Sequence, residues 1–231
     1  MILPIRDDIR SRSAPLITVA LIAGCGVVFY YQWTDPATTL QYAFDAHNLV
    51  STEILRAPAH VLATLVTSVF LHGGPFHIVT NMLFLWIFGD NVEDRLGKIK
   101  FPLFYVLCGV AGNLAQAVFS GFRVTMIGAS GAVAGVLAAY FISFRGSRVL
   151  TFIFPWSLFA GLIPIPARFF IFLWIVLQVF AGAGALAGQS SNVAWFAHIG
   201  GFAAGLLLCK WMCPRERPPR RGPRLEWIEE R

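Results

Sequence analysis

Charged side chains are scarce in this sequence. Asp, Glu, Lys and Arg make up 13% of its 231 residues, whereas soluble domains carry roughly 25%. Hydrophobic residues reach 57%, and the mean hydropathy is +0.67. A water-soluble core cannot hide so large an apolar share. This scarcity of charge excludes an ordinary soluble domain and predicts an all-α, polytopic membrane helix bundle.

Cysteine is also rare, and its positions exclude two classes of structure. The four cysteines are Cys25, Cys108, Cys209 and Cys213. None falls in an expected outer loop, so we expect no disulfide framework. Cys209 and Cys213 are four residues apart, but no second pair completes a zinc site. We therefore expect neither a metal nor another cofactor.

Six apolar runs approach or reach the roughly 17–25 residues that a membrane-spanning helix needs. They are Pro15–Trp33, Phe76–Val92, Phe101–Gly121, Ala129–Phe144, Phe169–Gly188 and Val193–Met212. The fourth run is short, and the second is marginal. We expect six transmembrane helices within residues 15–213, between an N-terminal tail at 1–14 and a basic tail at 214–231.

The positive charges give this bundle an orientation. If the N-terminus is cytoplasmic, all 18 Lys and Arg residues except Arg56 and Arg123 fall in inner segments. This asymmetry is typical of multi-pass membrane proteins and places both termini in the cytoplasm. The basic tail then favours contact with anionic lipid head groups over binding of nucleic acid.

The N-terminal run has a second interpretation. Arg10 and Arg12 before an apolar stretch resemble a signal peptide, and Ile22–Cys25 resembles a lipoprotein cleavage site. The apolar character continues beyond Cys25, where a processed lipoprotein normally turns polar. An uncleaved first helix is therefore favoured.

Two segments between the runs need separate treatment. In the long outer loop, about Thr34 to Gly74, helical spacing of apolar residues predicts an amphipathic interfacial helix; these residues are Leu62, Leu65, Val66, Val69 and Phe70. The segment Leu150–Ala167 is apolar but contains three prolines. We expect an irregular interfacial or re-entrant segment there.

Four polar residues within the runs share one depth. Ser130 begins the fourth run, and His198 lies in the first third of the sixth; both runs enter from the outer side. His77 and Asn81 lie on one face of the second helix, again in its outer turns. His72 precedes that helix across a Gly-Gly break. Polar groups inside a membrane need a partner or a function.

Small residues predict that the fourth and sixth helices pack closely. Gly131 and Gly135, like Gly201 and Gly205, form small-xxx-small faces, which would bring Ser130 within reach of His198. A Ser–His pair can attack a peptide carbonyl. Alternatives remain open, since Ser130 could bond only its own backbone. In another alternative, His72, His77 and His198 could hold a metal with Asn81. A transporter or channel would be expected to place charged residues at the midplane, which this sequence lacks.

Three segments together resemble the rhomboid family of intramembrane serine proteases. They are Leu71–Asn81, Gly128–Gly131 and Ala197–Gly205, and they match in order, spacing and helix placement. The resemblance implies that Ser130 is the nucleophile and His198 the general base of a dyad. It implies oxyanion-side roles for His77 and Asn81 and a structural role for His72. It also implies that the substrates are transmembrane proteins, cut near the outer end of a helix, with the fifth helix resembling the substrate gate.

The sequence departs from the family pattern at Ala134, where many members have an aromatic residue that stacks on the base. What orients His198 is therefore open. A non-catalytic chaperone or binding protein on the same fold is the alternative, although such proteins usually lose the serine or the histidine. We expect a bacterial inner membrane from the small size of the chain. Its substrate, organism and oligomeric state are not indicated.

Overall fold

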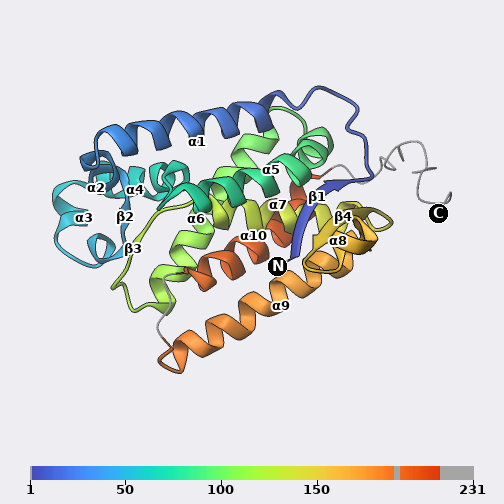
Figure 1. Cartoon of the computed structure of the whole chain (residues 1–231). Coiled ribbons are helices and arrows are strands. Elements are labelled where there is room, and N and C mark those ends of the chain that lie inside the picture. Colours follow the sequence, from blue (N-terminus) through green and yellow to red (C-terminus); the bar gives the residue numbers. More distant parts are fainter. Residues whose placement is uncertain (1, 190–192, 214–231) are drawn as a thin grey trace.

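The computed structural model describes residues 2–189 and 193–213, and the expected basic tail lies outside them. The fold is mostly helical (Figure 1). A long helix occupies each of the six predicted positions; the helices are α1 (Leu16–Thr34), α5 (Pro75–Leu96), α6 (Lys100–Phe119), α7 (Ser130–Ser143), α9 (Ala167–Leu186) and α10 (Trp195–Met212).

Fewer than six of these helices qualify as membrane spans by length and apolar composition. Within the described residues, α1, α6 and α9 qualify. The segment 58–70, which holds α4 (Pro58–Thr67) and η2 (Ser68–Phe70), adds a fourth span only if it is counted together with α5, to which it is bent by 81°. The chain is thus an integral membrane protein with three to four candidate spans, and α7 is a shorter apolar helix.

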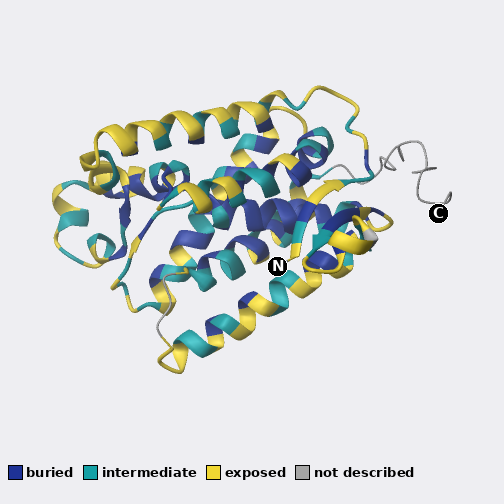
Figure 2. Cartoon of the chain, in the orientation of Figure 1, coloured by how far each residue is buried: buried dark blue, intermediate teal, exposed yellow. Residues whose placement is uncertain are grey.

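Helix α7 forms the centre of the bundle. Every residue from Gly131 to Tyr140 is buried, and the helix packs against α5, α6 and α10. Figure 2 shows this buried centre, with exposed residues along α1 and α9 at the periphery. Exposed apolar side chains on peripheral helices are suited to contact with lipid. Helix α7 is therefore the helix most enclosed by protein.

The predicted glycine faces of α7 and α10 meet. The backbone of Gly201 lies directly against the Gly131 carbonyl group, and a Cβ atom added at Gly205 would lie 2.5 Å from the Gly135 carbonyl oxygen. Side chains at these positions would hold the helices apart. Backbone-to-backbone packing therefore sets the crossing that carries the outer ends of both helices together.

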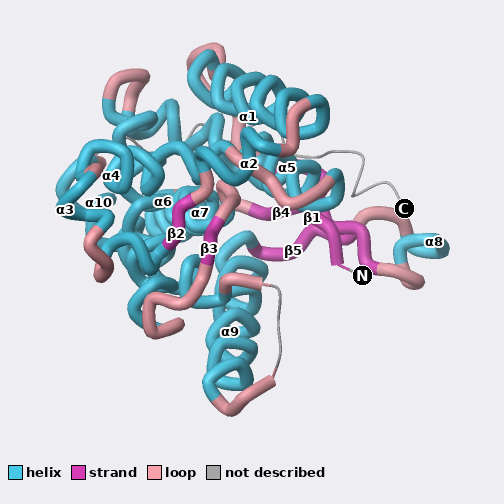
Figure 3. The backbone as a smooth tube through the Cα atoms, turned by 90° about the vertical axis from the view of Figure 1, so that its left-hand side faces the viewer, coloured by secondary structure: helices cyan, strands magenta, loops and turns pink. Residues whose placement is uncertain are grey.

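A small antiparallel sheet is formed by two segments that we expected to be a tail and an irregular segment. Strand β1 (Ile2–Asp7) pairs with β4 (Arg148–Ile153), which pairs with β5 (Ile163–Pro166); the helix α8 (Ser157–Ala160) lies in the β4–β5 connection (Figure 3). Residues 2–7 are thus part of the fold, and Leu150–Ala167 is a β-hairpin rather than an irregular segment. Pro164 and Pro166 are compatible with β5 because it is an edge strand.

A buried acidic residue joins α5 to the beginning of α1. Glu93 is 1% exposed, and its carboxylate accepts hydrogen bonds from the Ile17 and Thr18 backbone N–H groups at 3.1 and 2.7 Å. The Thr18 hydroxyl donates a third, at 2.8 Å. The first N–H groups of a helix have no partner within the helix, so Glu93 acts as a cap supplied by another helix.

The segment expected to be the long outer loop folds into short elements at one end of the bundle (Figure 1). They are α2 (Ala37–Tyr42), β2 (Phe44–Asp45), η1 (Ala46–Leu49), α3 (Glu53–Arg56), α4 and η2; β2 pairs with β3 (Thr125–Met126). The expected amphipathic helix is present, since α4 and η2 bury Leu65 and Val69 and expose Leu62 and Val66.

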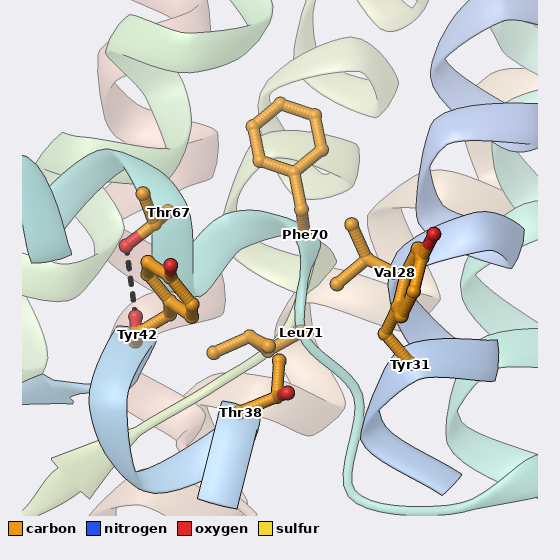
Figure 4. A pocket seen from close by; sticks show the side chains of 7 residues that line it. All are labelled: Val28, Tyr31, Thr38, Tyr42, Thr67, Phe70 and Leu71. Carbon is orange, nitrogen blue, oxygen red and sulfur yellow. Dashed lines mark hydrogen bonds between the residues drawn. The ribbon is translucent and has the colours of Figure 1, made fainter. Parts of the chain in front are cut away.

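A pocket of about 420 Å³ lies between α1 and this loop (Figure 4). Its lining is mostly apolar, and the Thr67 hydroxyl donates to the Tyr42 carbonyl at one side at 2.8 Å. The lining residues are Val28, Tyr31, Thr38, Tyr42, Thr67, Phe70 and Leu71. The predicted polar residues of the site are not among them.

Candidate active site

Ser130 is the first residue of α7, and the turn before it depends on Gly128. Gly128 has a φ of +131°, a conformation that side-chain-bearing residues rarely adopt. Its N–H donates to the Ser68 carbonyl at 2.9 Å, which ties the turn to the corner between α4 and α5. The Asn113 side chain holds the same corner, since its amide donates to the Ser68 hydroxyl at 2.9 Å. These hydrogen bonds therefore fix the position of the turn from which Ser130 begins α7.

The ring of His77 faces this turn. A Cβ atom added at Gly128 would lie 2.9 Å from His77 Nε2 and 3.8 Å from Ser130 Oγ, so both groups border the same small space. The Gly73 N–H donates to His77 Nδ1 at 3.2 Å. A neutral imidazole that accepts at Nδ1 carries its proton on Nε2. His77 thus presents an N–H group beside Ser130.

Asn81 and His72 both contact His77. Asn81 is 6% exposed, and its amide donates to the His77 carbonyl at 2.9 Å, one turn along the same helix face. The His72 ring is buried, and its centroid is 5.3 Å from that of His77. Gln32 on α1 accepts from the His72 N–H at 2.9 Å and donates to its carbonyl at 3.2 Å. His72 is therefore fixed through its backbone.

His198 lies in the first turn of α10, which is capped from α6. Gln116 Oε1 accepts from the Phe196 and Ala197 N–H groups at 2.9 and 3.3 Å. The His198 ring contacts α9, where its Nδ1 is 2.7 Å from Gln178 Oε1. Capping fixes the helix, and the contact with α9 fixes the ring.

Ser130 and His198 lie on adjoining turns of α7 and α10. A Cβ atom added at Gly131 would be 3.2 Å from the Ala197 carbonyl oxygen, so the neighbours of both residues touch. Among the residues that the structure describes, no hydrogen bond joins Ser130 Oγ to the His198 ring. Catalytic hydrogen bonds are often long in the absence of substrate. The structure thus places Ser130 and His198 next to residues of α7 and α10 that touch.

Two tryptophans flank the ring of His198. The centroid of the Trp174 ring lies 5.7 Å from that of the His198 ring, with 34° between the ring planes. The Trp195 centroid lies 6.2 Å from it, and the two planes meet edge to face at 87°. Ala134 is fully buried in the centre of the bundle. The aromatic surroundings of His198 therefore come from α9 and α10.

Sequence reasoning missed Gln178, Trp174 and Gln116. Gln178 carried a usable signal, because it is the one polar side chain other than tryptophan within the apolar run Phe169–Gly188. A lone polar residue in a membrane segment marks a functional site by default. Trp174 and Gln116 carried none, since tryptophan and a terminal glutamine are common in membrane helices.

The alternative of a metal site is not supported. Within residues 2–189 and 193–213, no group of three His, Cys, Asp or Glu side chains is arranged to hold a metal ion. The three histidines of the candidate site instead contact one another, backbone groups or Gln178.

Comparison with known proteins gives the family. The Rhomboid domain model matches residues 59–215, which include every predicted site residue. The chain belongs to the rhomboid family. It is 32% identical to RHOMBOID-like protein 1 of Arabidopsis thaliana over 149 residues, which cover 64% of this chain and 34% of that protein. It is 32% identical to RHOMBOID-like protein 4 of the same plant over 162 residues, which cover 70% and 35%.

A third relative is named as inactive. This rhomboid is 33% identical to Inactive rhomboid protein 1 of Rattus norvegicus over 142 residues, which cover 61% of this chain and 14% of that protein. The chain thus spans about a third or less of the length of these relatives. Family membership includes both rhomboid-like and inactive proteins. The three relatives are plant and animal proteins, so they do not support the expected bacterial membrane.

Proposed function

We propose that this rhomboid is an intramembrane serine endopeptidase. In this proposal all six long helices cross the bilayer with both termini cytoplasmic, and Ser130 and His198 form the dyad in its outer half. The substrates are membrane proteins, cut in or near a transmembrane helix. The observation that carries the proposal is the pair of contacts at Nδ1 of His77 and Nδ1 of His198, which suit His77 to donate a hydrogen bond and His198 to accept a proton beside Ser130.

The donor is His77 and the acceptor is His198. His77 accepts from Gly73 at Nδ1 and therefore offers Nε2–H near Ser130. His198 is engaged by Gln178 at Nδ1, which leaves Nε2 as the nitrogen available to take a proton. A nucleophile between a hydrogen-bond donor and a base is the arrangement that acyl transfer requires.

The chemistry needs only side chains, backbone and water. His198 Nε2 takes the Ser130 proton as Oγ attacks the peptide carbonyl carbon. The oxyanion accepts hydrogen bonds from His77 Nε2–H and from the second N–H of the Asn81 amide. The intermediate collapses as His198 protonates the leaving amine. Water, deprotonated by His198, then hydrolyses the acyl-enzyme and restores Ser130.

The second candidate is a non-catalytic rhomboid-like chaperone or binding protein. The similarity to Inactive rhomboid protein 1 favours it. Against it, Ser130 and His198 are both retained, and the groups that would hold each of them in its catalytic form are present. A binding protein has no need of a fixed tautomer at either histidine.

Cleavage of a reconstituted single-span substrate tests the proposal. We expect Ser130→Ala and His198→Ala to abolish both cleavage and labelling of the protein by a fluorophosphonate, which reacts with activated serines. Ser120→Ala and His60→Ala are matched controls, since the Ser120 hydroxyl donates to the Ala117 carbonyl of its own helix and His60 is exposed. Equal cleavage by the wild type and Ser130→Ala would contradict the protease proposal.

A further inference from the structure

Gln178 has a defined orientation between α9 and α10. Its side chain is 8% exposed, and its amide nitrogen donates to the Trp174 carbonyl at 3.3 Å. A carbonyl oxygen can only accept, so the group that faces Trp174 is the NH₂ and the group that faces His198 is the oxygen. The orientation of the amide follows from its two partners, the Trp174 carbonyl and the His198 ring.

The orientation of the amide sets the protonation of the base. Gln178 Oε1 accepts only, so the His198 nitrogen 2.7 Å away is the one that carries the proton. The ring is therefore the Nδ1–H tautomer, with the Nε2 lone pair free. Trp174 and Trp195 limit rotation of the ring about its attachment. Gln178 thus supplies the hydrogen-bond acceptor for the His198 ring, and Trp174 packs against that ring.

The face of α9 that carries Gln178 also packs against α10. Gly182 lies one turn beyond Gln178, and a Cβ atom added there would be 3.4 Å from the Phe196 ring and 3.5 Å from the Ile199 side chain. Most other side chains of α9 are exposed or half-buried. The helix is attached near its outer end by a narrow strip that includes the bond to His198.

We propose that Gln178 is a positioning residue that holds His198 in its Nδ1–H tautomer and makes that tautomer depend on the seating of α9. Its catalytic consequence rests on the proposed protease function. The tautomer itself does not, because it follows from the contacts alone. A displacement of α9 from α10 would remove the acceptor and leave the base free to reprotonate on Nε2, the form that cannot accept the Ser130 proton.

The tautomer is measured directly by ¹⁵N NMR of protein labelled at histidine and solubilised in detergent. His198→Ala identifies the resonances of the ring by difference. We expect protonated Nδ1 in the wild type and loss of that state in Gln178→Met, which keeps the side-chain length but has no acceptor oxygen. Gln178→Glu keeps an oxygen and should keep Nδ1–H. Leu177→Met, at an exposed neighbour on α9, should leave the spectrum unchanged.

Catalysis is measured in parallel. We expect Gln178→Met to lower kcat and the rate of fluorophosphonate labelling by about ten- to a hundredfold with little change in KM, because general-base catalysis contributes about 10²–10⁴-fold. Gln178→Glu should recover most of the labelling rate. A merely structural role for Gln178 would instead lower the melting temperature of both variants alike and leave the tautomer of the folded fraction unchanged.

The two proposals fail in different ways. Protonated Nε2 in the wild type, or an unchanged tautomer in folded Gln178→Met, overturns the positioning role whatever the activity. A wild type with protonated Nδ1 that neither cleaves nor labels overturns the protease function and leaves the positioning role standing. If Gln178→Met does not fold, the wild-type tautomer and the Gln178→Glu spectrum still decide.

Discussion

The backbone of Gly201 on α10 lies directly against the carbonyl group of Gly131 on α7, and no space remains for a Cβ atom. We expect Gly201→Ala to lower the free energy of unfolding by about 1–3 kcal/mol or more, because the helices must separate. It should also slow labelling of Ser130. Denaturation in mixed micelles measures the first effect. Gly24→Ala on α1, where nothing lies within 4 Å, is the control and should be neutral.

Gly128 should affect activity more than stability. A Cβ atom there meets the His77 ring at 2.8 Å, and the φ of +131° is strained for alanine. We expect Gly128→Ala to move His77 away from Ser130 and to reduce kcat by about a hundredfold, the scale of losing one oxyanion donor. Gly74 directly precedes α5, the helix that carries His77, and a Cβ atom there faces open space. Gly74→Ala should therefore cleave like the wild type. Equal kcat in both variants would remove His77 from the oxyanion site.

Glu93 should be a stability residue without a catalytic role. Gln at this position loses the charge and one acceptor oxygen, so we expect Glu93→Gln to cost about 1–2 kcal/mol. Glu53→Gln is the matched control, because Glu53 pairs only with Arg56 on the surface, a contact worth less than about 1 kcal/mol. Thermal unfolding of the two variants separates these cases; equal melting temperatures would show that Glu93 does not cap α1.

The positions of the long helices could be predicted because apolar runs and glycine spacing are local signals. The apolar runs located all six within a few residues. The sheet was missed because β1 and β4 are far apart in sequence and β5 contains two prolines, which as local signals indicate a break. Pairing along an edge strand tolerates them, but only tertiary contacts reveal that edge.

The residues of the candidate site also divide into those that the sequence predicts and those that only helix packing reveals. Ser130, His198, His77 and Asn81 were predicted from residue type, depth and family resemblance. The contact between Gln178 and the His198 ring was not, because it joins two different helices, α9 and α10. Which helix approaches a given ring depends on helix packing, and single-sequence patterns do not encode that choice.

Asp7 should make stability depend on pH. Burial raises the pKa of this β1 carboxyl from 3.8 to about 8, the charges of Asp90 and Asp8 add to the rise, and the hydrogen bond from Tyr140 opposes it. Between these two values the folded state binds more protons than the unfolded state, so its stability falls as pH rises from about 4 to about 8. Asp7→Asn should flatten this slope in thermal unfolding. Asp35→Asn, at an exposed position directly after α1, is the control, and an equal slope in Asp7→Asn and the wild type would exclude Asp7 as the source.

Gly182 offers a graded test of how closely α9 must seat. A Cβ atom there makes ordinary contact with Phe196 and Ile199 at 3.4–3.5 Å, so Gly182→Ala should keep both the His198 tautomer and activity. Gly182→Leu adds three further carbons that have no room and should push α9 outward, away from His198. We expect it to lose protonated Nδ1 in the ¹⁵N spectrum and to label slowly, like Gln178→Met, while α7 and α10 stay packed through their glycines. If Gly182→Leu keeps the wild-type tautomer, the base does not depend on the seating of α9, and the bond to Gln178 adapts to movement of the helix.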